Sequence, residues 1–167
     1  MRLAESLIEE LEREAKSTVR MLERVPTDRF DWKPHEKSMS VGQLAWHVAT
    51  LPLNGVLGLK SKVKEVGGIG PRPSPQGGQD LVATLNDSVA QLKAALQATP
   101  DETLIKERFS FVRNGQPVVS FPMIGLIRTV VLNHSVHHRG QLSVYLRLMN
   151  IPVPAMYGTS ADESAFD

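Results

Sequence analysis

Two histidines interrupt the apolar row of the longest amphipathic segment in this 167-residue chain. Apolar residues at helical spacing run from position 124 to position 148, and His134 and His138 occupy two places in that row. Residues four apart lie on one face of a helix, so both imidazoles should face the interior, where aliphatic side chains are expected. The row consists of Ile124, Ile127, Val131, His134, His138, Leu142, Tyr145 and Leu148. This pattern predicts a core helix that carries two polar rings.

His47 has a similar setting on another amphipathic segment, among Leu44, Val48 and Leu51. A buried imidazole without a partner costs about 1–3 kcal/mol, so each ring needs a hydrogen bond or a metal ion. Each histidine alone could be a core residue whose nitrogens meet a backbone carbonyl or a hydroxyl. Three histidines that converge in one helical core favour a shared cation instead. We therefore predict a metal site made by His47, His134 and His138.

Composition limits the class of protein. With 41% hydrophobic and 22% charged residues, the chain fits one compact domain over residues 1–167. The net charge of +1, with dispersed lysines and arginines, gives no support for nucleic-acid binding. The chain has no cysteine, so disulfides, cysteine zinc sites and a protein thiolate nucleophile are excluded, and thiol chemistry would need an added thiol. The first residues lack a signal-peptide pattern and no segment approaches ~18 apolar residues, so we expect a cytoplasmic protein that does not bind membranes.

Helical periodicity predicts a first helix over about 2–24 with its glutamates and Lys16 in solvent. Its inward residues should be Leu3, Leu7, Leu11, Ala15, Val19 and Leu22. The following proline-containing connection carries Phe30 and Trp32, which we expect to close one end of the core.

The second helix should begin at Ser40, because Gln43 three residues later completes a capping box. Pro52 should kink or interrupt this helix. The Gly/Pro-rich residues 61–79 should form a long irregular loop, which either covers the site or only connects helices. The loop lacks the GxxxxGK[ST] phosphate-binding pattern, and Arg72 alone is weak evidence for an anion site.

A third helix is expected over about 80–98. After it, alternating aromatic and polar residues around Asn114-Gly115 predict a short β-hairpin, with Pro117 keeping the second strand at a sheet edge. The last helix should begin near Ser120 as N-cap and continue to about residue 149. The fold class predicted is all-α, a four-helix bundle with a long Gly/Pro-rich loop and a short hairpin before the last helix.

Four segments resemble the DinB-like, or DinB/YfiT, family over nearly the whole chain. They are FDWKP, SVGQLAWHVATL, NHSVHHRGQL and IPVPAMYG. The resemblance implies a four-helix bundle that binds one divalent cation, often nickel or zinc, through residues that by position are His47, His134 and His138. It also implies a homodimer. Related families use such a metal for reactions of low-molecular-weight thiols, including isomerases and S-transferases, whereas many members have no assigned activity.

Three neutral imidazoles leave the full charge of a dication available to a further ligand. Water in an open position could then approach a pKa near ~7, or a substrate thiol could bind as thiolate. Imidazole ligands suit Zn²⁺, Ni²⁺, Co²⁺ or Fe²⁺ better than Mg²⁺ or Ca²⁺. The ligands alone do not choose among the first four ions.

Other polar residues near these segments are less informative. His137 lies at the margin of the inward row, where we favour a surface position over a role as a base. His35 lies in a loop and is expected at the surface. Gln141 could orient a ligand or bond to a neighbouring helix. No carboxylate pairs with the histidines by spacing, so the sequence assigns no general acid or base.

Three functions remain open from the sequence. The first is a metal-dependent enzyme, a thiol S-transferase or a hydrolase, acting on a small electrophilic molecule. The second is a noncatalytic bundle that a metal stabilises and that serves dimerisation or partner binding. The third is a metal-free bundle with structural histidines.

Overall fold

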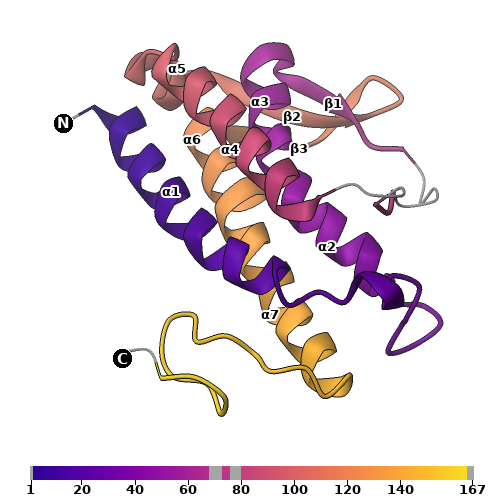
Figure 1. The fold of residues 1–167 in the computed structure, drawn as a ribbon. Coiled ribbons are helices and arrows are strands. Elements are labelled where there is room, and N and C mark those ends of the chain that lie inside the picture. The colour runs from indigo at the N-terminus through magenta and orange to yellow at the C-terminus, as the bar shows by residue number, and fades with distance from the viewer. Residues whose placement is uncertain (1, 68–72, 76–79, 165–167) are drawn as a thin grey trace.

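Helices form most of the protein, and a small three-stranded sheet lies beside α3, α5 and α6 (Figure 1). The computed structural model describes residues 2–67, 73–75 and 80–164. The elements are α1 (Leu3–Leu22), η1 (Thr27–Arg29), α2 (Val41–Thr50), α3 (Pro52–Ser61), β1 (Val63–Glu65), α4 (Leu81–Gln97), α5 (Asp101–Lys106), β2 (Arg108–Arg113), β3 (Gln116–Pro122), α6 (Met123–Leu126), η2 (Ile127–Asn133) and α7 (His134–Leu148). Within the described residues, none of the helices has the length and apolar character needed to cross a membrane.

The first helix confirms the predicted periodicity, with Leu7, Leu11 and Leu22 buried along α1. One glutamate departs from the expectation that all of them are solvated. Glu14 has a side chain only 14% exposed and pairs with Arg139 of α7, because the two helices pack against each other there. The other end of α1 is held by Asp101, whose carboxylate accepts hydrogen bonds from the backbone N–H groups of Leu3 and Ala4 at 2.7 and 3.2 Å.

The Asp101 contact predicts acid sensitivity. Hydrogen bonds from the Leu3 and Ala4 amides hold the pKa of Asp101 below its ordinary value of 3.8. A carboxyl with a lowered folded pKa stabilises the fold above its ordinary pKa, and that contribution is lost as the pH falls through the folded pKa. We expect Asp101→Asn to be less stable at about pH 7 and to lose less stability than the parent on acidification to about pH 3. Urea unfolding of both proteins at the two pH values measures this.

Glu102→Gln is the matched control, because Glu102 is an exposed neighbour that pairs with Lys106 on the surface of α5. It should follow the parent at both pH values. Equal acid sensitivity of Asp101→Asn and the parent would contradict the assignment.

The second helix begins and ends as local sequence predicts. Ser40 Oγ accepts a hydrogen bond from Gln43 N at 3.2 Å, and Gln43 Oε1 accepts one from Ser40 N at 2.9 Å. This is the predicted capping box. Pro52 interrupts the helix as expected: α2 ends at Thr50 and α3 begins at Pro52. The third long helix, α4, begins after Asp80, whose carboxylate caps the amides of the first turn.

The hairpin before the last helix is also confirmed. β2 and β3 pair antiparallel, and Asn114 and Gly115 take positive φ angles of 51° and 73° at the turn. Pro117 lies in β3, which is an edge strand as predicted, since the sheet order is β1-β2-β3. The prediction of an irregular loop over residues 61–79 is wrong at Val63–Glu65, because these residues form β1 and pair parallel with β2. Residues 68–72 and 76–79 of that loop, Arg72 among them, lie outside the described residues.

The start of the last helix differs from the prediction. Ser120 is not an N-cap, because it lies in β3, where its Oγ accepts a hydrogen bond from Arg108 Nε at 3.1 Å. The helix begins after Pro122, and it is not α-helical throughout, because residues Ile127–Asn133 form a π-helical segment. Leu148, predicted to face inward, is 59% exposed. Past Leu142 the buried row continues through Leu146 and Met149 instead.

Two groups of buried side chains form the core. The first lies where the N-terminal half of α1 and the C-terminal half of α4 meet α3, β2, α6 and η2. An added Cβ at Gly58 would lie 2.1 Å from the Leu126 side chain, so glycine permits the close packing of α3 on α6. The second group joins α1, α2, α4 and α7, and Phe30 and Trp32 pack on its margin as expected. The candidate metal centre lies between α2 and α7, the helices that this second group joins.

Candidate metal centre

His134 and His138 begin α7 and project to the same side of it, one turn apart. Their ring centroids are 4.5 Å apart, and the two Nε2 atoms are separated by 2.7 Å. The π-helical segment ends at Asn133, immediately before the first of them. Backbone of this kind is frequent at functional sites. The predicted convergence of the helical pair is therefore present.

The third imidazole comes from α2, which packs against α7. The His47 ring centroid lies 5.2 Å from that of His134 and 4.7 Å from that of His138. One nitrogen from each of the three rings lies within 4.8 Å of the others, and among the described residues no carboxylate joins this group. Segments some ninety residues apart in sequence thus bring three ring nitrogens to one point.

Gln141 fixes the orientation of one ring. Its Oε1 lies 2.7 Å from His138 Nδ1, and because an amide oxygen accepts, this contact requires the tautomer with its hydrogen on Nδ1, which leaves the Nε2 lone pair facing His134 Nε2. Metal-binding histidines commonly have such a partner, which sets the tautomer and the ring plane. His138 is 6% exposed, so water competes little for this bond. The donor set and its support fit a divalent ion of the zinc and nickel group.

A cavity of about 170 Å³ opens beside this cluster. It is lined by Gln43, Trp46, His47, Thr50 and Pro73. Except for the proline, these residues lie on one side of α2. A larger cavity of about 360 Å³ lies between α1 and α4, but it contains none of the three histidines. The smaller cavity therefore borders His47, one of the three rings of the candidate centre.

The remaining sequence candidates do not join the group. His137 is exposed, and its ring packs against that of His138 with the centroids 4.9 Å apart. His35 is exposed in the loop before α2, where Nδ1 accepts a hydrogen bond from Lys37 N. Arg72 lies outside the described residues. His47, His134 and His138 are brought together, and Gln141 supports one of them.

Sequence reasoning missed a buried arginine next to the site. The Arg139 side chain is 2% exposed and forms an ion pair with Glu14 of α1. Burial raises the pKa of Glu14, but hydrogen bonds from Tyr157 and Arg139 outweigh it, so the pKa lies below its ordinary value. Burial and the hydrogen bond to Glu14 raise the pKa of Tyr157 to about 12. No periodicity signals a buried charge, because Arg139 is a typical surface residue by type.

Gln43, Trp46 and Thr50 were also missed as cavity residues. The available signal was spacing, since Gln43 and Thr50 lie four before and three after His47 and share its face of α2. Gln43 was already explained as part of the capping box, and in the structure it both caps α2 and lines the cavity.

Comparison with known proteins gives a family assignment. The Bacillus subtilis protein YrdA is 23% identical over 152 residues, covering 91% of this chain and 86% of that protein. The crystal structure of a DinB-like protein from Bacillus cereus matches with a TM-score of 0.71 and 25% identity, covering 92% of this chain and 97% of that one. The DinB-like protein YjoA from Bacillus subtilis matches in fold with a TM-score of 0.65 and 20% identity, covering 89% and 96%. The DinB family model matches residues 1–166, and the chain belongs to the DinB family.

Proposed function

We propose that the protein is a metal-dependent enzyme that binds one divalent transition-metal ion, nickel or zinc, through His47, His134 and His138. Water or a low-molecular-weight thiol would attack a small electrophilic substrate at this centre. The observation that carries the proposal is the convergence of one nitrogen from each ring within 4.8 Å. We propose a four-helix bundle, made by α1, α2 with α3, α4, and α6 with α7, as the frame that holds the three rings.

Some residues of the site orient the histidines, and others shape the cavity through which a substrate would enter. When bound, the ion supplies Lewis acidity and lowers the pKa of a water or thiol beside it. Gln141 holds His138 in the tautomer whose Nε2 lone pair faces the site. Trp46 and Thr50 line the cavity beside His47 and limit the substrate to a small molecule. The family resemblance favours thiol transfer slightly over hydrolysis.

A noncatalytic role for the same metal is the second candidate. The three histidines come from α2 and α7, so an ion held between them would cross-link two helices and stabilise the fold. The cavity at His47 favours the enzyme, because a catalytic ion keeps a position open to exchange and a purely structural one is enclosed by protein ligands.

The test begins with metal analysis of untagged protein, as purified and after incubation with Zn²⁺ or Ni²⁺ and desalting. We expect one equivalent of metal per chain. The loaded and chelated forms are then assayed for consumption of small thiols and for hydrolysis of activated esters. Turnover only by the loaded form supports the enzyme. A large fall in melting temperature on chelation, with no turnover by the loaded form, supports the structural role, and failure to retain any metal would refute both.

We also propose that the protein is a homodimer that pairs through the outer face of α7. Val136, Val144 and Leu148 are 38%, 56% and 59% exposed on this helix. Gly140 lies between them, and an added Cβ there would meet nothing within 4 Å among the described residues. A glycine inside a helix costs about 1 kcal/mol relative to alanine, and close approach of a second helix would explain it. Sedimentation equilibrium of the intact chain measures the assembly state.

A further inference from the structure

The buried Arg139 guanidinium joins α7 and α1 to the C-terminal segment, where its partner Tyr157 is largely exposed. Its Nη1 donates to the backbone oxygen of Glu14 at 2.7 Å and to Thr18 Oγ1 at 2.9 Å. Its Nη2 donates to the Glu14 carboxylate and to the Tyr157 hydroxyl. Tyr157 in turn donates to Glu14 Oε2 at 2.5 Å. These contacts define a three-residue clasp, made by Glu14, Arg139 and Tyr157.

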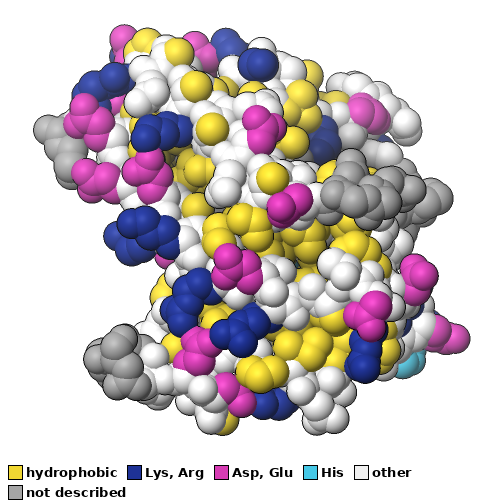
Figure 2. Space-filling view, in the orientation of Figure 1, with side chains coloured by type: hydrophobic (Ala, Val, Ile, Leu, Met, Phe, Trp, Pro, Cys, Tyr) yellow, Lys and Arg dark blue, Asp and Glu magenta, His cyan; other side chains and the backbone are white. Residues whose placement is uncertain are grey.

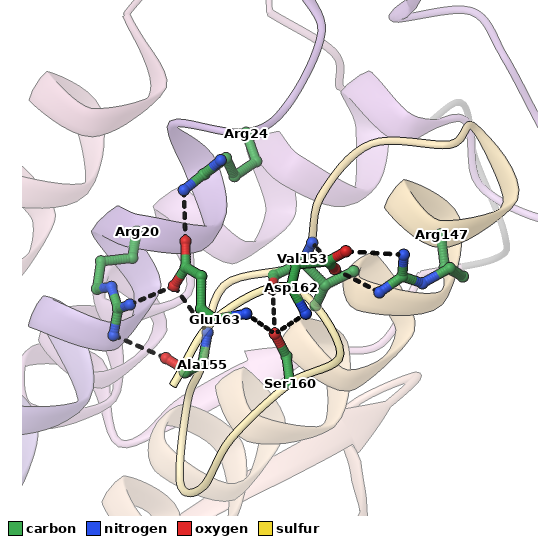
Figure 3. A network of polar contacts seen from close by, with 8 residues as sticks. All are labelled: Arg20, Arg24, Arg147, Val153, Ala155, Ser160, Asp162 and Glu163. Atoms are coloured by element: carbon green, nitrogen blue, oxygen red, sulfur yellow. Dashed lines mark hydrogen bonds and ion pairs between the residues drawn. The ribbon is translucent and has the colours of Figure 1, made fainter. Parts of the chain in front are cut away.

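The C-terminal segment is held in place by a separate set of ion pairs (Figure 3). Glu163 pairs with Arg20 of α1 and with Arg24, two residues beyond the end of that helix, at 2.5 Å in each case. Asp162 pairs with Arg147 of α7 and accepts a hydrogen bond from Val153 N. On the face seen in Figure 2, acidic and basic side chains are interspersed, with hydrophobic side chains between them. The ion pairs of Glu163 and Asp162 fasten the C-terminal segment to α1 and α7, and Tyr157 reaches the clasp from this fastened segment.

The clasp and the histidines lie on different faces of α7. Consecutive helical residues are about 100° apart around the axis, so His138 and Arg139 point in different directions. His138 faces His47 on α2, while Arg139 is fixed on α1. The planar guanidinium meets its acceptors on α1 in a fork geometry, which constrains the orientation of the Arg139 side chain as well as its distance from α1.

We propose that the clasp is a positioning device that sets the rotation of α7 and so aims His134 and His138 at His47. The proposal rests on the metal centre proposed above. A metal site requires its ligands to be held within about 0.5 Å and 10–20° of their working geometry. Gln141 orients one ring, but it lies on α7 itself and cannot fix that helix relative to α2. The contact of Arg139 with α1 and the C-terminal segment lies outside α7 and can therefore set the orientation of that helix.

The test uses Co²⁺, whose visible absorption reports the geometry of its ligands. We compare the full-length parent with Tyr157→Phe and Arg139→Lys, well below their melting temperatures. Tyr157→Phe keeps the ring and removes the hydroxyl, whereas Arg139→Lys keeps the charge and removes the fork. We expect both variants to bind Co²⁺ roughly tenfold more weakly, as when a hydrogen-bond partner of a metal ligand is lost, and to show an altered spectrum. Lysine should therefore fail to rescue the site although it preserves the charge.

Asp101→Asn is the control for a general loss of stability. It also removes a carboxylate contact to α1, but at Leu3 and Ala4, some ten residues and roughly 15 Å along the helix from Glu14. Its Co²⁺ affinity and spectrum should match those of the parent. Parental affinity and spectrum in folded Tyr157→Phe and Arg139→Lys would overturn the clasp while leaving the metal proposal intact. A parent that binds no Co²⁺ would overturn the metal proposal itself.

Discussion

Replacing His138 with alanine is expected to weaken metal binding by more than about 100-fold. Loss of a residue that only supports a ligand costs 10–100-fold in affinity, and loss of the ligand itself should exceed that range. His138 is also the best supported of the three rings, because Gln141 holds its Nδ1 and burial excludes water. The remaining His47 and His134 would leave an ion with two protein donors.

Thermal unfolding with and without Zn²⁺ gives the size of the effect. At a free ion concentration 100 times the dissociation constant, binding stabilises the parent by about 2.7 kcal/mol. For a chain of this length that raises the melting temperature by roughly 5–11 °C. The His138→Ala protein at the same concentration should gain only about 0.4 kcal/mol, or roughly 1–2 °C.

His137→Ala and His35→Ala are the matched controls, since both rings are exposed and lie outside the group. Each should keep the parental response to Zn²⁺. An equal metal-induced shift in His138→Ala and the parent would contradict the proposed ligand set.

Short-range signals predicted most of the fold. The capping box at Ser40, the break at Pro52 and the turn at Asn114-Gly115 are each set by a few adjacent residues, and each is present in the structure. The strand β1 escaped prediction because it has three exposed residues and no alternation of its own. Its pairing with β2 depends on a partner more than forty residues away.

The three histidines of the candidate site could be predicted from the sequence, but the residues that pack around them could not. An imidazole in an apolar row is conspicuous, so His47, His134 and His138 stand out by sequence alone. Glu14 and Arg139 do not, because a glutamate and an arginine on amphipathic helices match ordinary surface positions. Only the packing of α1 on α7 makes their pairing buried.

The second large effect concerns stability. Glu14→Ala is expected to destabilise the fold by about 3 kcal/mol, because it leaves the Arg139 charge buried without its carboxylate. Removal of one partner of a buried pair costs about 3–5 kcal/mol, and the partial exposure of Glu14 places this pair at the lower end. The melting temperature should fall by roughly 6–12 °C for a chain of this length. Urea unfolding and calorimetry measure the two quantities.

Glu12→Ala tests whether burial, rather than pairing, produces that loss. Glu12 lies on the same helix and pairs with Lys93 of α4, but the two side chains are 44% and 40% exposed. An exposed pair contributes about 0–1 kcal/mol, because water solvates either charge when its partner is removed. The two glutamates differ mainly in the surroundings of their cationic partners, 2% exposed for Arg139 and 40% exposed for Lys93. Similar losses for both variants would show that the Arg139 charge finds solvent or another partner once Glu14 is gone, and that α7 is not anchored to α1 through this pair.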